Sequence, residues 1–351
     1  MNIVLLSGGS GNRLWPLSTP ENSKQFLKIL KTDDGRTESM LQRVFAQIHR
    51  VDPSAVVTVA TSADQAAEIH RQLGEAIKIS IEPDKKDTFP AIVLASSYLV
   101  DVLQIVAMMT EDPEVIAAAY LHDVKHVPVE EAVVVCPVDP FADDSFFATI
   151  RDACAYISSV QEHLMLLGIT PTAPLEKYGY IVPKAENDIS LVASFKEKPD
   201  KKNAQRYIDN GALWNAGVFV FKLSYILKRA HELIDFSDYY DLFQKYHTLE
   251  RISFDYAVVE HEKDILVKRY NGAWSDIGTW DALTATMDTH FVGKAVSDRP
   301  ENVFVINETE KPIIVLGLEN VVVSATDSGI IVSDIQASHN IKPYVDQAKN
   351  L

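Results

Sequence analysis

The chain is poor in glycine and cysteine. It has 14 glycines in 351 residues, about 4% against a usual level of roughly 7%. Its two cysteines, Cys136 and Cys154, cannot build a disulfide framework, so each is predicted to be a small buried hydrophobic residue in a reducing compartment, the cytoplasm. Three of the scarce glycines, Gly8, Gly9 and Gly11, lie within four positions, and this cluster is the first candidate site.

Basic residues are outnumbered as well. The 33 Lys and Arg residues against 49 Asp and Glu residues give a formal charge of −16, which argues against binding nucleic acid or an anionic membrane through a basic surface. No apolar run approaches the ~18 residues that span a bilayer, and the first residues lack the basic region and length of a signal peptide. The composition is typical of a soluble globular protein.

Short β-branched runs alternate with helical patterns through most of the chain. The predicted buried strands are residues 3–6, 55–60, 77–82, 132–137 and 164–169, and the predicted helices are 40–50, 63–73, 91–109 and 145–161. This alternation indicates a Rossmann-like α/β domain with a mixed, mostly parallel sheet flanked by helices. Ligands should then bind beyond the carboxyl ends of the strands.

After about residue 290 only short β runs remain, at 303–306, 313–316, 321–324 and 330–332. They predict a small sandwich-like piece or a few coils of a β-solenoid. We therefore expect two domains, residues 1–290 for the chemistry and residues 291–351 for a structural or assembly role.

The first predicted strand runs directly into the glycine cluster, and Arg13 and Lys24 follow. Glycines let backbone N–H groups approach a phosphate, because no Cβ intervenes. The pattern is no dinucleotide fingerprint, since Leu14 stands where the third glycine belongs, and it is no Walker P-loop. The two cations favour a polyphosphate-binding loop, while a turn that needs glycine for its geometry alone is the alternative.

The stretch from Leu6 to Ser18, with Lys-Gln-Phe-Leu from Lys24 onward, closely resembles the opening signature of the mannose-1-phosphate guanylyltransferases. Similar motifs follow over roughly residues 2–333, and only residues 104–131 look longer than the family's usual link. The resemblance implies a nucleotide-diphospho-sugar transferase (GT-A-like) fold with a small C-terminal left-handed β-helix. It also implies that GTP and mannose 1-phosphate are converted to GDP-mannose and pyrophosphate with Mg²⁺.

Residues 81–92 resemble the family segment associated with the base and ribose, with Lys86, Asp87 and Phe89 in place of the common Arg, Asn and Ala. A carboxylate can accept hydrogen bonds from guanine, so Asp87 is compatible with that base. A helix start with Thr88 as the cap is the structural interpretation. The residues implied to bind the nucleotide are Leu6, Ser7, Gly8, Gly9, Gly11, Asn12, Glu82, Pro83, Asp87 and Thr88.

The family's sugar-binding motifs match at Gly179 and Tyr180, at Glu197 and Lys198, and at Asn215. Glu197 can accept hydrogen bonds from two sugar hydroxyls, and Lys198 can neutralise the sugar phosphate. The alternatives are ordinary edge-strand tyrosines and a solvated Lys-Glu-Lys face. Residues 253–260 match a family helix start, in which Ser253 and Glu260 are predicted to be structural.

Two aspartates are the candidate metal ligands. Asp139 ends a predicted apolar strand, where a capping or turn role is the alternative, and Asp276 lies in a Trp-Ser-Asp-Ile-Gly-Thr-Trp motif. The resemblance implies that both hold Mg²⁺, while Pro140 replaces a histidine of the family and inherits no role.

The reaction needs no general base, because a phosphomonoester, with a second pKa of about 6, is already ionised at neutral pH. Arg13 would clamp the β- and γ-phosphates, Lys24 the α-phosphate and Lys198 the sugar phosphate for in-line attack. Another hexose 1-phosphate or nucleoside triphosphate, or a non-catalytic regulatory subunit, are the alternatives. A homodimer is the default assembly.

Overall fold

The computed structural model describes residues 1–8, 12–19, 22–32, 34–100, 127–287 and 289–348. The chain divides into two compact units. Unit 1 comprises Met1–Gly8, Phe45–Pro137 and Ala142–Ala273, and unit 2 comprises Gly9–Val44, Val138–Phe141 and Trp274–Leu351. Of the longer segment predicted at 104–131, residues 104–126 lie outside the described residues, as do Gly9 and Gly11. The predicted domain boundary at residue 290 stays a prediction.

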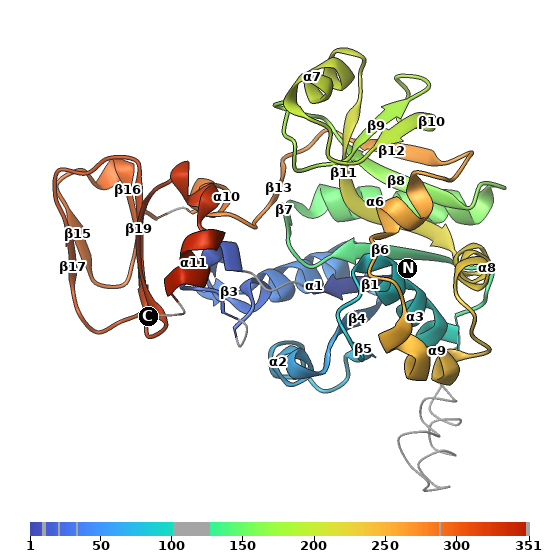
Figure 1. Cartoon of the computed structure of the whole chain (residues 1–351), viewed down its shortest axis with the longest axis horizontal. Helices are drawn as coiled ribbons and strands as arrows, with labels where there is room; N and C mark the ends of the chain where they lie inside the picture. Colours follow the sequence, from blue (N-terminus) through green and yellow to red (C-terminus); the bar gives the residue numbers. More distant parts are fainter. Residues whose placement is uncertain (9–11, 20–21, 33, 101–126, 288, 349–351) are drawn as a thin grey trace, which may run out of the picture. The chain divides into compact units, whose positions relative to one another are not determined.

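Unit 1 is built on a nine-stranded sheet (Figure 1) with the order β5-β4-β1-β6-β11-β8-β12-β10-β9. The strands are β1 (Asn2–Ser7), β4 (Val56–Ser62), β5 (Lys78–Glu82), β6 (Ala132–Pro137), β8 (Leu164–Ile169), β9 (Tyr180–Pro183), β10 (Ile189–Lys196), β11 (Leu213–Lys222) and β12 (Leu266–Tyr270). Seven run in one direction, and β10 and β11 run in the other. The predicted α/β class with a mixed sheet is confirmed.

Helices pack on this sheet or on one another, as expected for an α/β fold. They are α1 (Met40–Val51), α2 (Ala63–Leu73), α3 (Thr88–Val100), α6 (Asp144–Ser159), α7 (Lys201–Asp209), α8 (Leu223–Leu233) and α9 (Tyr239–Lys245). The α3 helix is buried on nearly every side, in agreement with its largely apolar sequence. It begins three residues before the predicted start, and the predicted continuation beyond Val100 lies outside the described residues.

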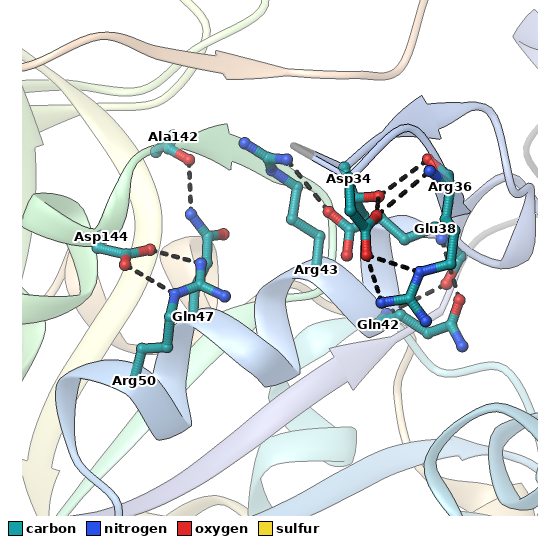
Figure 2. Close-up of polar contacts among 11 residues, drawn as sticks. Asp34, Arg36, Glu38, Gln42, Arg43, Gln47, Arg50, Ala142 and Asp144 are labelled. Carbon is teal, nitrogen blue, oxygen red and sulfur yellow. Dashed lines mark hydrogen bonds and ion pairs between the residues drawn. The ribbon is translucent and has the colours of Figure 1, made fainter.

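The ends of α1 and α6 are held by local polar contacts (Figure 2). In unit 1, the Arg50 guanidinium forms two 2.8 Å hydrogen bonds with Asp144 at the start of α6, and Gln47 donates to the Ala142 carbonyl at 2.9 Å. At the start of α1, in unit 2, Ser39 and Gln42 exchange hydrogen bonds of 3.1 and 3.2 Å. This reciprocal pair is a capping box, and it explains why the helix starts at residue 40.

The C-terminal strands of unit 2 form two small sheets. One contains β14 (Phe291–Val292), β16 (Val303–Asn307), β18 (Val321–Thr326) and β19 (Gly329–Asp334), and the other contains β15 (Ala295–Ser297) and β17 (Ile313–Val315). Val303 pairs in parallel with Val321, and Ala295 with Ile313, so the chain returns to each sheet after 18 residues. All four predicted β runs are strands, and the last of them, β19, pairs antiparallel with β18. The predicted left-handed β-helix stays a prediction.

The two cysteines are buried in unit 1, as predicted. Burial raises the pKa of the Cys154 thiol to about 11, which disfavours a nucleophilic thiolate. Among the described residues, no helix combines the length and the apolar character needed to cross a membrane.

Candidate active site

Unit 2 brings the two predicted metal ligands together. Asp139 directly precedes β7 (Pro140–Ala142), and Asp276 ends β13 (Trp274–Asp276), the strand with which β7 forms a two-stranded sheet. The Ile277 amide donates to the Asp139 carbonyl at 3.4 Å. Residues far apart in the sequence are therefore neighbours, because these two short strands pair.

Lys24 lies at the same place. Its ammonium group forms an ion pair with the Asp139 carboxylate and donates to the Ile277 carbonyl at 3.4 Å. A Cβ added to Gly278 would lie 3.4 Å from Lys24 Nζ and 3.7 Å from Asp276 Oδ2. The amine and both carboxylates thus surround one small region, which we call the Lys24 cluster (Lys24, Asp139 and Asp276).

The donor set of the Lys24 cluster fits Mg²⁺. This ion commonly takes one or two carboxylates and completes its octahedron with water and substrate phosphate oxygens. In the part of the chain that the structure describes, no group of three or more His, Cys, Asp and Glu side chains could hold a metal alone. The two carboxylates, with the Lys24 ammonium beside them, therefore suit a Mg²⁺ ion that takes its remaining ligands from water and a phosphate.

Arg13 lies in the short helix Asn12–Leu14, also in unit 2. The Arg13 side chain is exposed, while the next residue, Leu14, is fully buried in the core of the unit. The turn after the glycine cluster is thus anchored by an apolar side chain, and it presents its guanidinium to solvent.

In unit 1, Glu197 and Lys198 follow directly after β10. Glu197 is buried, with a side chain 6% exposed, and it forms an ion pair with the Lys198 ammonium, whose side chain is 57% exposed. Burial alone would lower the pKa of Lys198, but its hydrogen bond to Glu197 and the charges of Glu197 and Asp255 outweigh burial and raise it. Lys198 is therefore a cation at neutral pH.

Gly179 lies against the Glu197 carboxylate, and Asn215 is hydrogen-bonded to Gly179. The Asn215 amide N–H donates to the Gly179 carbonyl at 2.8 Å. A Cβ on Gly179 would lie 2.6 Å from Glu197 Oε2, so only glycine lets Glu197 pack this closely. Four of the residues predicted to bind the sugar phosphate therefore form one group, which we call the Glu197 cluster (Gly179, Glu197, Lys198 and Asn215).

Tyr180 does not share this arrangement. Its side chain is fully buried, its hydroxyl donates to the Leu175 carbonyl at 3.0 Å, and it accepts from Trp214 Nε1 at 3.0 Å. The tyrosine side chain stabilises the strand, in agreement with the structural alternative. Only its backbone is left for a ligand.

One residue outside the Glu197 cluster, which the sequence did not single out, contacts it. Asp255 accepts a 2.7 Å hydrogen bond from the Asn215 side-chain amide. Burial, followed by the charge of Glu197, raises the pKa of Asp255 to about 7. Glu260, predicted to be structural, accepts from the Glu197 backbone amide at 3.4 Å.

The predicted nucleotide segment surrounds the start of α3. Thr88 is the first helical residue rather than the residue before the helix, so the predicted cap is wrong by one position. The Asp87 carboxylate accepts from the Thr88 amide at 2.8 Å, and the Thr88 hydroxyl accepts from the Phe254 amide at 2.8 Å. Glu82, at the end of β5, accepts from the Tyr246 hydroxyl at 3.0 Å, and burial raises its pKa.

The departures from the family pattern are absorbed inside unit 1. Lys86 donates to the His247 carbonyl at 2.7 Å and pairs with Asp84 at 3.4 Å. Phe89 is buried in the core, with its ring centroid 6.5 Å from that of Phe254. Both side chains therefore make their contacts with other residues of unit 1.

Two predicted site residues have a strained backbone. Among the described residues, four non-glycine residues have a positive φ, and two of them are Asp87 (70°) and Lys198 (43°). Such conformations cost on the order of 1–3 kcal/mol and cluster at functional sites. The positive φ values of Asp87 and Lys198 therefore support their prediction as site residues.

The predicted phosphate loop is described in part. Ser7 ends β1, fully buried, and its carbonyl accepts from the Thr61 hydroxyl at 3.0 Å. Leu6 is partly buried against the core, and Gly8 is exposed, with no atom of the described residues within 4 Å of an added Cβ. Pro83, of the nucleotide segment, is exposed.

A family model described as nucleotidyl transferase matches residues 2–290 of the chain. The chain belongs to the nucleotidyl transferase family. The resemblance predicted from its motifs is thereby confirmed, and the chain is placed among the enzymes of this family.

Curated relatives match the whole chain. Xanthan biosynthesis protein XanB of Xanthomonas campestris pv. campestris (strain B100) is 31% identical over 377 residues, covering 99% of this chain and 73% of that protein. A mannose-1-phosphate guanylyltransferase of Salmonella montevideo is 28% identical over 383 residues, with the same coverage.

Solved structures of this class share the fold. The crystal structure of a mannose-1-phosphate geranyltransferase from Thermus thermophilus has a TM-score of 0.74 at 24% identity, covering 99% of this chain and 98% of that one. A UDP-glucose pyrophosphorylase complexed with UDP-glucose has a TM-score of 0.54 at 14% identity, covering 81% and 96%.

Proposed function

We propose that this chain is a mannose-1-phosphate guanylyltransferase, which converts GTP and α-D-mannose 1-phosphate to GDP-mannose and pyrophosphate. The observation that carries the proposal is the Glu197 cluster, because it combines an acceptor for sugar hydroxyls with a cation for a phosphate. The Salmonella relative supports the choice of substrates by its name.

The Glu197 cluster would bind the mannose 1-phosphate. Glu197 Oε2 lies against Gly179, where no side chain intervenes, and it can accept hydrogen bonds from sugar hydroxyls. Lys198, with its exposed ammonium group, would hold the phosphate. The buried carboxylate thus orients the hexose, and the lysine orients the nucleophile.

The Lys24 cluster would act on the triphosphate. Asp139 and Asp276 would hold Mg²⁺, which when bound neutralises phosphate oxygens in the transition state. Lys24 would contribute a positive charge to the α-phosphate, and exposed Arg13 would clamp the β- and γ-phosphates.

The chemistry is an in-line displacement. A phosphate oxygen of mannose 1-phosphate attacks the α-phosphorus of GTP, a new P–O bond forms, and the bond to the β-phosphate oxygen breaks so that pyrophosphate leaves with the electron pair. The nucleophile is already ionised, so no side chain has to remove a proton. Alignment and neutralisation of charge by Lys24, Lys198 and Arg13 are the contributions of the protein.

Guanine is proposed on narrower grounds. The Asp87 carboxylate is exposed and accepts from the Thr88 amide through Oδ1, which leaves acceptor capacity for the N1 and N2 donors of guanine. Because Lys86 and Phe89 are occupied within unit 1, their departures from the family do not remove this acceptor.

The test is a matrix of pyrophosphate-release assays that pairs each of the four nucleoside triphosphates with mannose, glucose and galactose 1-phosphates. We expect the highest kcat/KM for GTP with mannose 1-phosphate. A larger value for another pair would replace the proposed substrates. Binding of nucleotide without any release would instead favour the regulatory-subunit alternative.

We also propose left-handed winding and a catalytic–solenoid boundary near residue 290. The 18-residue return of the chain supports a β-helix.

A cytoplasmic homodimer is proposed as the working form. Light scattering at micromolar concentration should give twice the 39.1 kDa chain mass, and a monomer mass would refute the dimer.

A further inference from the structure

The side-chain amide of Asn215 is fixed in one of its two orientations. Its Oδ1 accepts from the Gly217 backbone amide at 3.1 Å, and its Nδ2 donates to Asp255 Oδ1 at 2.7 Å. Flipping the amide would place two donors together at Gly217 and two acceptors together at Asp255. Because Asn215 is only 8% exposed, water cannot readily replace these partners. Asp255 therefore determines which atom Asn215 presents to a ligand.

Asp255 also faces the charges of the Glu197 cluster. It begins the five-residue π-helix Asp255–Val259, and Glu260, which follows this helix, accepts a hydrogen bond from the Glu197 backbone amide at 3.4 Å. The groups that act on it electrostatically are Glu197 and Lys198. Two further charged groups, Lys196 and Glu260, form a 3.5 Å ion pair at the end of β10. The Tyr256 hydroxyl is the other titratable group on this helix that acts on Lys198.

We propose that Asp255 is a positioning residue of the sugar-phosphate site, which fixes the Asn215 amide and places a second carboxylate beside Lys198. This inference rests on the proposed function of the Glu197 cluster. Asp255 acts through its neighbours: it orients a hydrogen-bonding group for the sugar and sets how strongly Lys198 attracts the phosphate.

The second role couples binding to protonation. Burial and the charge of Glu197 raise the pKa of Asp255 to about 7, so the carboxylate exchanges a proton near neutrality. A dianionic phosphate held by Lys198 repels the ionised form and favours the protonated form. Binding of hexose 1-phosphate should therefore take up a proton, and the affinity should fall as the pH rises through 7.

Two substitutions separate the roles. In Asp255→Asn, the amide oxygen can still accept from Asn215, but the charge is gone; in Asp255→Ala, both are lost. Asp188→Asn is the matched control, because it removes an exposed carboxylate of the same unit that pairs with Lys268, a residue outside the Glu197 cluster.

The experiment measures KM and kcat for both substrates between pH 6 and 9, together with calorimetric binding of mannose 1-phosphate in buffers of different ionisation enthalpy. For Asp255→Ala we expect KM for mannose 1-phosphate to rise about tenfold, the effect of one lost hydrogen bond, with KM for GTP unchanged. For Asp255→Asn we expect a KM near the wild-type value below pH 7, no proton uptake, and no loss of affinity above pH 7. The second ionisation of mannose 1-phosphate contributes equally to the proton uptake of every variant, so it cancels when the variants are compared with the wild type.

The inference is overturned if Asp255→Ala leaves KM for mannose 1-phosphate unchanged, or if Asp255→Asn takes up the same number of protons as the wild type and Asp188→Asn. Should Asp255→Ala fail to fold, the proton count of the isosteric Asp255→Asn decides alone. A wild-type protein that neither binds nor turns over any hexose 1-phosphate would overturn the proposed function, and the inference with it. If the wild type turns over normally and the Asp255 variants have the same KM and proton uptake as the wild type, only the inference is overturned.

Discussion

Replacing Gly179 with alanine tests whether the Glu197 carboxylate occupies a functional position. The added Cβ would lie 2.6 Å from Glu197 Oε2 and 2.8 Å from Phe195 Cζ, whereas ordinary contacts begin at 3.4 Å. Glu197 cannot simply rotate into solvent, because its side chain is buried and paired with Lys198. The carboxylate must therefore shift by about 0.8 Å and the Phe195 ring by about 0.6 Å, or the backbone must move.

The size of the effect follows from this displacement. Overpacking of a filled site typically costs about 1–3 kcal/mol of stability. A catalytic or binding group misplaced by about 1 Å can cost on the order of 10²-fold in rate. We therefore expect Gly179→Ala to lose about 1–2 kcal/mol of unfolding free energy. Its kcat/KM for mannose 1-phosphate should fall about 10- to 100-fold, with KM for GTP nearly unchanged.

The control is Gly211→Ala, in the loop after α7. Gly211 has a φ of +77°, but the nearest atom to an added Cβ is Glu186 Oε1 at 4.0 Å, so alanine strains the backbone without a collision. It should cost about 1–2 kcal/mol and leave the kinetics unchanged. Urea denaturation and initial-rate assays measure both quantities. If Gly179→Ala keeps the wild-type KM for mannose 1-phosphate, Glu197 does not bind the sugar.

Three other predictions follow from the two units. Arg13→Ala should lower kcat about 10²-fold or more without shifting the urea midpoint, because the side chain is exposed; near-normal turnover would refute its role. Asp139→Asn and Asp276→Asn should each move the Mg²⁺ titration of activity to higher concentrations, and an unchanged titration would exclude the residue as a ligand. Asp255, with a pKa raised from 3.8 to about 7, keeps a proton in the native state that the unfolded chain releases, so wild-type stability should fall as the pH rises from about 4 to 7. In Asp255→Asn the urea midpoint should lose that part of its pH dependence, and identical profiles would contradict the shifted pKa.

Local pattern predicted the secondary structure of unit 1 well. Residues 132–137 form a strand with the predicted bounds, because an uninterrupted β-branched run at the centre of a sheet is buried on both faces. Pattern could not predict that β11 inserts antiparallel between β6 and β8, since strand order is decided by the packing of the whole sheet. The one-residue error at Thr88 arose because Asp87 and Thr88 are both common capping residues.

The candidate site depended more on resemblance than on pattern. Asp139 and Asp276 are neighbours because β7 and β13 pair, which no spacing in the sequence reveals. Asp255 escaped notice because an acidic residue at a helix start has a sufficient local explanation, namely the helix dipole. The Asp255 carboxylate has a further partner, the side-chain amide of Asn215, and only the folded structure brings these two residues together.

The charges of the two clusters explain how so acidic a chain could bind polyanions under the proposed function. Lys24 faces two carboxylates, and Lys198 faces Glu197 and Asp255, so at each place acids outnumber the lysine. A divalent cation would change the formal sum of the Lys24 cluster from negative to positive, and a proton on Asp255 would leave Lys198 balanced by Glu197 alone. Neither lysine therefore attracts phosphate unaided. Binding should require the metal in unit 2 and be strengthened by the proton in unit 1, so the nucleotide and the sugar phosphate should respond to different variables. Omitting Mg²⁺ should abolish nucleotide binding and leave mannose 1-phosphate binding intact. Raising the pH should weaken mannose 1-phosphate binding and leave nucleotide binding unchanged.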